Sequence, residues 1–274
     1  MEQQLGKTAS ADGTTIAYEA YGSGPVAVVV GGAFCDRGAF RDLAQALGGL
    51  GLTGITYDRR GRGDSGDNQA EADDWRRTVL ACEVEDLVAV LGMGESDSPA
   101  YVFGVSSGGA LVIEALAAGA RITRAAAIEV PYRSAAWPAP DDYLGTLERF
   151  EAAGDREGIL RYFNGVVVGM PDEMVDALVG TPTWEPMLSM AYTVKYDGLS
   201  LGGDDQSLPV DTLRGITAPF LSVCSSGTAM PPLHDAAQVL ADALPNGRAL
   251  ELPGEFHRVA APVLAPVLAE FFLS

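Results

Sequence analysis

The chain has 274 residues, of which 47% are hydrophobic, so it can bury a large core and has the length of one α/β domain with an insertion. Its net charge of −19 would repel nucleic-acid phosphates and anionic lipid headgroups, which argues against nucleic acid and membrane as partners. Three widely spaced cysteines without a CxxC pair are typical of reduced, buried thiols. The sequence starts without a cationic and apolar signal region, and no apolar run approaches the roughly 20 residues of a membrane span. We therefore expect a cytoplasmic protein.

Short apolar runs rich in β-branched residues alternate with longer segments in which apolar residues recur every three or four positions. This alternation predicts an α/β fold with a mostly parallel, doubly wound sheet that helices cover on both faces. Runs such as VAVVV and YVFGV are apolar throughout, as expected of strands buried on both sides. In chain order, the predicted strands are residues 14–22, 26–32, 52–58, 100–106, 124–130, 218–225 and 248–254, and the predicted helices are residues 75–91, 110–118, 232–244 and 259–272.

The alternation stops between Tyr132 and Gly203, where prolines flank several short helical patterns. This break predicts a helical insertion of residues 132–203 into a core made of residues 1–131 and 204–274. The stretch from Tyr132 to Ser200 holds 9 of the 21 aromatic residues in the chain. An insertion so rich in apolar groups either packs a small core of its own or lines a pocket.

A candidate nucleophile lies where the predicted strand 100–106 meets the helix that follows it. Residues 104–108 read Gly-Val-Ser-Ser-Gly, a G-x-S-x-G pattern in the strand-turn-helix context of a nucleophile elbow. Such a turn is sharp and strained, and its glycines let neighbouring backbone approach closely. The spacing favours Ser106 over Ser107 as the nucleophile. The backbone N–H of Ser107 is then an oxyanion donor.

A serine nucleophile needs a base, and the chain has only two histidines. His257 follows the last predicted strand, so it is expected at the same edge of the sheet as Ser106 and is the candidate general base. His234 lies early in a predicted helix and is interpreted as a surface or packing residue.

Four motifs in this order resemble the α/β-hydrolase superfamily over nearly the full length of the chain. VAVVVGGAF is similar to its strand and oxyanion loop, YDRRGRGDS to its Asp-x-Arg-Gly-x-Gly-x-Ser turn, GVSSGG to its elbow and LPGEFH to its histidine loop. The resemblance implies that the insertion is a helical cap over the active site. In the second motif, Asp58, Arg60 and Gly63 are interpreted as residues that shape a loop.

The oxyanion loop departs from the family pattern, because Gly31-Gly32 stands where the family usually has His-Gly. The second oxyanion donor is a backbone N–H, so Ala33 or Phe34 can still supply it.

The acid of the triad is the second departure. The family's usual acid follows the strand at 218–225, but the succeeding SGTAMPP has no carboxylate, and Asp235 lies too far along the helix. Some family members carry the acid after the preceding strand, where this chain has Glu129. Glu129 can instead pair with an arginine such as Arg133, Glu255 is a further alternative, and a serine-histidine pair without a carboxylate is another.

Together these features predict a serine hydrolase that cleaves an ester, lactone or thioester of a bulky apolar or aromatic small molecule. Ser106, His257 and Glu129 are the expected catalytic residues, and Tyr143 and Trp184 are expected to contact the substrate. No metal or organic cofactor is indicated, because the sequence has neither a clustered His/Cys set nor the spacing of a dinucleotide site. The alternatives are a lyase or cyclase of the same fold and a ligand-binding protein without catalysis. The sequence does not indicate an oligomeric state.

Overall fold

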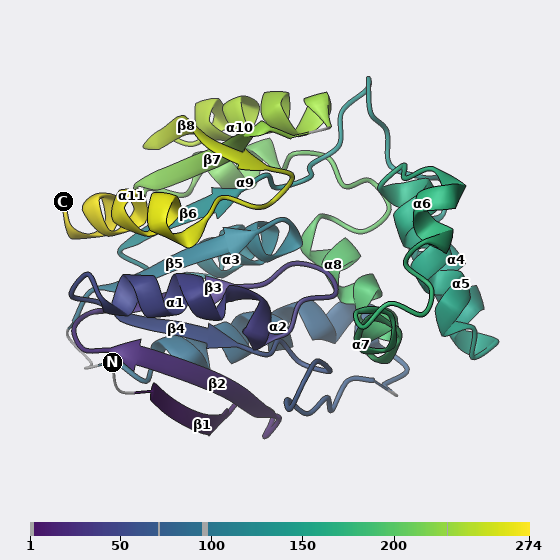
Figure 1. Cartoon of the computed structure of the whole chain (residues 1–274), viewed down its shortest axis with the longest axis horizontal. Helices are drawn as coiled ribbons and strands as arrows, with labels where there is room; N and C mark the ends of the chain where they lie inside the picture. Colours follow the sequence, from purple (N-terminus) through teal and green to yellow (C-terminus); the bar gives the residue numbers. More distant parts are fainter. Residues whose placement is uncertain (1–2, 71, 95–97, 229) are drawn as a thin grey trace.

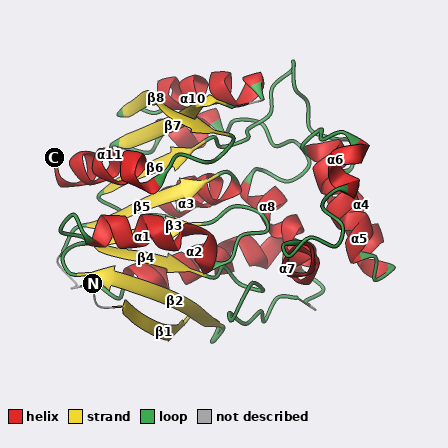
Figure 2. Cartoon of the chain, viewed as in Figure 1, coloured by secondary structure: helices red, strands yellow, loops and turns green. Residues whose placement is uncertain are grey.

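The computed structural model of the chain describes residues 3–70, 72–94, 98–228 and 230–274. The strands of this described part form one eight-stranded sheet in the order β1-β2-β4-β3-β5-β6-β7-β8 (Figures 1 and 2). Strands β3 to β8 run parallel to one another, and β2 is antiparallel to both of its neighbours, β1 and β4. This mostly parallel sheet confirms the predicted fold class. The strands are β1 Gln3–Ala9, β2 Thr15–Gly22, β3 Val26–Val30, β4 Thr53–Tyr57, β5 Ala100–Val105, β6 Arg124–Ile128, β7 Phe220–Gly227 and β8 Gly247–Glu255.

Strand β1 was not predicted from the sequence. It lies at the edge of the sheet, and none of its residues is buried, so it lacks the apolar alternation that marks a strand. Its pairing with β2, from Gln3 opposite Tyr21 to Ala9 opposite Thr15, is what makes it a strand. The pairing with β2 therefore determines that these residues form a strand, and the local sequence pattern does not.

Helices cover both faces of the sheet, as predicted. Leu43 of α1 and Leu268 of α11 pack on one face, and Leu87 of α2 and Leu111 of α3 pack on the other. Helix α1 is only eight residues long and was missed because its apolar pattern is short. No helix in the described ranges has both the length and the apolarity to cross a membrane. The helices are α1 Arg41–Gly48, α2 Trp75–Leu91, α3 Ser107–Ala117, α4 Tyr143–Ala152, α5 Arg156–Arg161, α6 Asp172–Asp176, α7 Trp184–Met190, α8 Val194–Ser200, α9 Val210–Arg214, α10 Pro231–Ala243 and α11 Ala261–Leu273.

The segment between β6 and β7 holds α4 to α9, of which α4 to α7 lie beyond one end of the sheet (Figure 1). These helices have a small core of their own, in which Leu147, Trp184 and Tyr196 pack with Trp75 of α2. Aromatic residues of this segment therefore do build a local core, and others of them line the cavity described below.

The turn from β5 into α3 brings three backbone segments too close together for side chains. A Cβ atom on Gly104 would lie 2.5 Å from the Cα of Gly109, and one on Gly108 would lie 2.4 Å from the carbonyl oxygen of Val30. Glycine at these positions lets α3 start directly against the ends of β5 and β3.

We expect Gly104→Ala to lower the free energy of unfolding by about 1–3 kcal/mol, because the new methyl group meets backbone that cannot move aside. Gly92→Ala is the control, since a Cβ there makes only ordinary contacts, the nearest at 3.4 Å. Thermal denaturation of both variants measures the difference. Equal melting temperatures would show that the turn relaxes and that close packing does not hold the start of α3.

Candidate active site

A cavity of about 550 Å³ lies at the carboxyl ends of the central strands, and Ser106 and His257 both line it. Its wall is mainly apolar, and it draws on the loop after β3, the turn after β5, the segment between β6 and β7, the start of α10 and the loop after β8. Such a concave, largely apolar site with a few polar groups is typical of a small-molecule pocket. Further lining residues include Ala33, Phe34, Cys35, Ser107, Arg133, Tyr143, Phe163, Val167, Met187, Asp197, Met230 and Leu233.

Ser106 occupies a strained turn between β5 and α3. Its backbone has φ of 54° and ψ of −126°, its N–H donates to the carbonyl of Ile128 at 3.0 Å, and its own carbonyl accepts the N–H of Gly109 at 2.8 Å. A non-glycine residue adopts this conformation only where its surroundings impose it. The turn therefore holds the Ser106 side chain at the cavity.

Backbone strain gathers around this cavity. Six non-glycine residues in the described part of the chain have a positive φ, and four of them, Phe34, Ser106, Gln206 and His257, line the cavity. A fifth, Glu129, contacts His257. Strained residues tend to cluster where a function requires an unusual geometry. The sequence carried no sign of this strain outside the elbow.

The carboxylate of Glu129 is completely buried and faces His257. Its Oε2 accepts the backbone N–H of His257 at 2.7 Å and lies 2.9 Å from the ring Nδ1, and its Oε1 accepts the backbone N–H of Ser225 at 2.9 Å and the hydroxyl of the same residue. The ring Nδ1 is thus within ion-pair distance of the carboxylate, but it has no hydrogen bond of good geometry among the described residues.

The other acids considered from the sequence do not reach His257. Asp235 is exposed and lies 4.0 Å from His234, and Glu255 is exposed and shares backbone hydrogen bonds with Arg258 across the turn that holds His257. The alternative pairing of Glu129 with Arg133 is wrong, because in the described part of the chain Glu129 lies within ion-pair distance of His257 and not of Arg133.

Burial raises the pKa of Glu129, but the contacts from His257 and Ser225 outweigh it and hold that pKa below its ordinary value. Glu129 is therefore ionised at neutral pH, and it presents a negative charge to the imidazole.

Three backbone N–H groups near Ser106 are suited to bind an oxyanion. The N–H groups of Ala33, Phe34 and Ser107 have no acceptor among the residues that the structure describes. Ser107 also begins α3, whose N-terminal end favours negative charge. The Ser107 hydroxyl is buried and donates to Asp197 at 2.7 Å, so it is bound within the protein while Ser106 faces the cavity.

Two buried arginines lie behind the oxyanion loop, and sequence reasoning missed their role. Arg59 and Arg62 both bind Asp197 of α8, at 2.6 and 2.8 Å, and they donate to the carbonyls of Gly31 and Gly32, at 3.3 and 2.6 Å. Arg59 also pairs with Glu83 at 2.6 Å. The two arginine residues occupy the x positions of the Asp-x-Arg-Gly-x-Gly turn in the sequence, but Asp197 is 138 positions from Arg59. Nothing local could have indicated this network.

The residues expected to shape the loop after β4 do so. Asp58 accepts the backbone N–H groups of Arg37 and Asp64 at 2.6 and 2.8 Å, and Arg60 pairs with Asp86 at 2.7 Å. A side chain at Gly63 would collide with Asp58.

The two aromatic residues expected to contact substrate lie in different places, one at the cavity and one in the core of the helical segment. Tyr143 lines the cavity, although it is almost fully buried and its hydroxyl lies 3.4 Å from the carbonyl of Val194. Trp184 is not among the described residues that line the cavity, and it packs in the core of the helical segment. Phe163, which sequence reasoning did not single out, lines the cavity and meets Phe34 edge to face at 5.1 Å.

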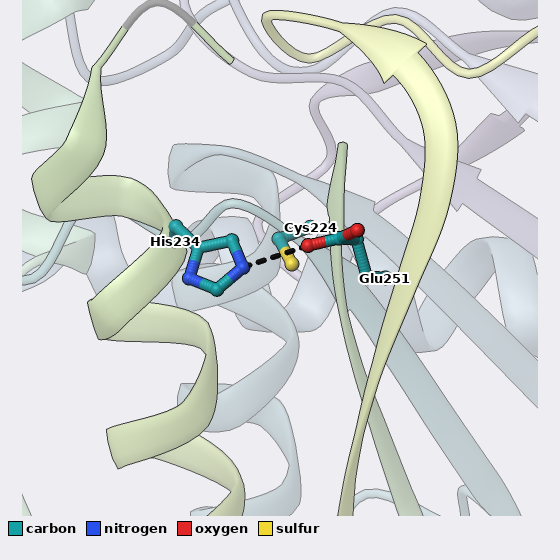
Figure 3. Close-up of side chains that lie close together, drawn as sticks. All are labelled: Cys224, His234 and Glu251. Carbon is teal, nitrogen blue, oxygen red and sulfur yellow. Dashed lines mark hydrogen bonds and ion pairs between the residues drawn. The ribbon is translucent and has the colours of Figure 1, made fainter. Parts of the chain in front are cut away.

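One further cluster carries metal-binding side-chain types. Cys224 of β7, His234 of α10 and Glu251 of β8 present donor atoms within 4.8 Å of one another (Figure 3). His234 and Glu251 already contact each other at 2.8 Å, and burial raises the pKa of the Cys224 thiol, which disfavours the thiolate that binds metals. We interpret the cluster as a contact that holds α10 against the sheet.

Cys35 is a second nucleophile type at the cavity. Burial raises the pKa of its thiol to about 11, so the thiol is protonated at neutral pH. It is therefore a weaker candidate nucleophile than Ser106.

Comparisons with known proteins agree with this geometry. The sequence model of the alpha/beta hydrolase family matches residues 27–266. The crystal structure of an alpha/beta hydrolase from Sphaerobacter thermophilus DSM 20745 is 39% identical, covers 97% of this chain and 100% of its own, and superposes with a TM-score of 0.84. The bottromycin epimerase BotH, solved with bottromycin A2, is 23% identical over 98% of this chain and 99% of its own, with a TM-score of 0.61, and is similar in fold. The uncharacterized hydrolase YraK of Bacillus subtilis (strain 168) is 34% identical over 108 residues, which are 39% of this chain and 37% of YraK.

We expect Asp197→Asn to lower the free energy of unfolding by about 3–5 kcal/mol at neutral pH, because it leaves two buried guanidinium groups short of a counter-charge. Arg62 and Arg59 outweigh burial and hold the pKa of Asp197 below its ordinary value of 3.8. The carboxylate therefore stabilises the fold above about pH 4, and this stabilisation is lost as the pH falls through the lowered pKa. Chemical denaturation of wild type and variant from pH 7 to pH 3 measures the difference, which should shrink toward the acid end.

Asp211→Asn is the control for this experiment, because Asp211 is exposed and its ion-pair partner among the described residues, Arg214, is exposed too. If the free energies of unfolding of Asp197→Asn and wild type instead differ little at every pH, Asp197 contributes little to the stability of the buried arginines.

Proposed function

This chain belongs to the alpha/beta hydrolase family, and from that membership we propose that it is a serine hydrolase that works through an acyl-enzyme. The proposed substrates are esters, lactones or thioesters of small molecules with a bulky apolar or aromatic part.

The observation that carries the proposal is the contact between buried Glu129 and His257 at a cavity that Ser106 shares. The carboxylate lies 2.9 Å from Nδ1, and His257 and Ser106 both line the cavity from strand ends. A nucleophile, a base and a group that orients the base are the three parts that activate a serine hydroxyl.

In the proposed reaction, the Ser106 hydroxyl attacks the carbonyl carbon of the substrate while Nε2 of His257 accepts its proton. Glu129 stabilises the imidazolium that forms, because it is ionised at neutral pH and lies on the Nδ1 side of the ring. His257 then returns the proton to the leaving group. In the second half, His257 activates a water molecule that releases the acid product from Ser106.

The tetrahedral intermediate carries an oxyanion, which the proposal assigns to the N–H groups of Ser107 and of Ala33 or Phe34. Arg59 and Arg62 hold the carbonyls of the preceding glycines and so keep the loop in place. Their positive charge is balanced by Asp197 and Glu83, so the network positions the loop and adds little net charge to the cavity.

The apolar wall supports an apolar or aromatic substrate. Phe34, Phe163 and Met187 are among the apolar residues that line the cavity, and Tyr143 adds an aromatic ring whose hydroxyl lies 3.4 Å from the carbonyl of Val194. We propose that the helical segment of residues 132–203 acts as a cap that selects the substrate, since Phe163 and Met187 belong to it.

A non-hydrolytic reaction is the second candidate. Its support is that the epimerase BotH shares the fold, so the fold alone does not require hydrolysis. Reaction in water labelled with oxygen-18 separates the two, because only hydrolysis places solvent oxygen in an acid product.

Ser106→Ala should remove nearly all turnover of a small activated ester and keep the melting temperature, because the lost hydroxyl faces the cavity and leaves no void in the core. A serine-reactive phosphonate should add its mass to Ser106 in the wild type, as read by peptide mass spectrometry. Ser226→Ala, a change at an exposed serine on β7, is the control and should keep full rate. Labelling of Ser107, or an active Ser106→Ala variant, would refute the assigned nucleophile.

Glu129→Gln should lower kcat for the same ester by about 10³- to 10⁴-fold, because an amide does not stabilise the imidazolium and can favour the wrong tautomer of His257. Asp235→Asn is the matched control and should have the wild-type rate. Circular dichroism and melting checks that both variants fold. A near-normal kcat for folded Glu129→Gln would remove Glu129 from the mechanism and leave a serine-histidine pair.

A further inference from the structure

We propose that the substrate carries a carboxylate, remote from the bond that is cleaved, and that Arg133 binds it. This inference rests on the proposed function for the cavity itself and adds to it the charge of the substrate.

Arg133 follows β6 and is fixed at the cavity by its backbone. Its N–H donates to the carbonyl of Gln206 at 2.7 Å, and its side chain lines the cavity with only 8% of the residue exposed. The guanidinium is therefore largely removed from bulk water while it borders the space that a substrate would fill.

The polar contacts of this guanidinium are incomplete. Nη2 donates to the carbonyl of Val167 at 2.9 Å, and the guanidinium carbon lies 3.8 Å from the ring centre of Trp137. Nε is buried without an acceptor, and no carboxylate in the described part of the chain lies within ion-pair distance of Arg133. Burial accordingly lowers the pKa of Arg133, because nothing negative compensates for the lost water.

The other buried arginines of this protein differ from Arg133 in that each has a carboxylate partner. Arg59, Arg60 and Arg62 are each almost completely buried, and each meets at least one carboxylate at 2.8 Å or less. A buried cation without a partner is costly, so the one that borders the cavity marks a place for an anion that comes from outside the chain.

The acids near the cavity cannot supply that anion. Glu129 is bound through both oxygens by His257 and Ser225, and Asp197 is bound by Arg59 and Arg62. In a chain with a net charge of −19, Arg133 gives the mainly apolar cavity a local positive site. A carboxylate fits it, because guanidinium N–H groups bind carboxylate oxygens with strong, charge-assisted hydrogen bonds.

The test compares two esters of the same shape: mono-4-nitrophenyl adipate, whose far end is a carboxylate, and the 4-nitrophenyl ester of adipamic acid, whose far end is a neutral amide. We expect the wild type to have the higher kcat/KM for the acid. Arg133→Met should lower kcat/KM for the acid by about 10- to 100-fold and leave that for the amide within a few-fold. Arg133→Lys, which keeps the charge, should recover part of the preference for the acid.

Two control variants isolate the position of the charge. Arg149→Met removes an exposed cation that is not among the described residues lining the cavity, and it should keep the wild-type preference. Arg258→Met removes the exposed arginine that also borders the cavity. A preference for the acid that disappears with Arg258→Met and survives Arg133→Met would overturn the proposal. A loss of rate that is equal for both esters in Arg133→Met would also overturn it, because that result indicates a purely structural arginine.

Failure of the hydrolase proposal gives a result different from failure of the anion-site proposal. If neither ester is turned over in a Ser106-dependent way, the hydrolase proposal fails, and binding of both esters to Ser106→Ala is then measured by calorimetry with and without Arg133→Met. Tighter binding of the acid that depends on Arg133 supports the anion site even then. Equal dissociation constants for acid and amide would overturn it.

Discussion

The buried carboxylate of Glu129 must be satisfied by hydrogen bonds, because a buried charge without partners would destabilise the fold. It is satisfied from two separate parts of the chain: Ser225 near the end of β7 holds one oxygen, and the loop after β8 holds the other through the backbone N–H of His257, whose ring Nδ1 lies 2.9 Å away. The same contact, which joins the carboxyl ends of β6, β7 and β8, therefore also fixes His257, the proposed base, at the cavity that Ser106 lines. The contact is accompanied by backbone strain, since Glu129 and His257 both adopt a positive φ.

A second set of buried charges supports the other side of the cavity. Arg59 and Arg62 join the loop after β4, the oxyanion loop and α8 through one shared acid, Asp197, which also holds the Ser107 hydroxyl. The loop that carries the proposed oxyanion donors is thus held by a network that spans the sheet core and the helical segment. Positive and negative groups balance within it, which leaves Arg133 as the buried cation at the cavity without a carboxylate among the described residues.

Close packing around glycine residues explains how Ser106 and Ser107 come to lie at the cavity. The glycines of the elbow allow α3 to start against β3 and β5, so the N–H of Ser107 and the hydroxyl of Ser106 lie at the cavity together. The aromatic residues of the helical segment divide between two roles: Trp184 and Tyr196 stabilise that segment, and Phe163 forms part of the cavity wall.

The sequence by itself determined the α/β fold, the elbow serine and the histidine after the last strand, because strand periodicity, turn glycines and strand-end positions are local properties. It left the acid open among Glu129, Asp235 and Glu255, and it did not reveal the edge strand β1, the network of Asp197 or the exclusion of Trp184 from the cavity. Those depend on contacts between distant residues, such as the 128 positions that separate Glu129 from His257. Only the parallel pairing of β6 with β7 and of β7 with β8 brings their ends together, and so only the tertiary structure decided which carboxylate faces the imidazole and which arginine was left without one.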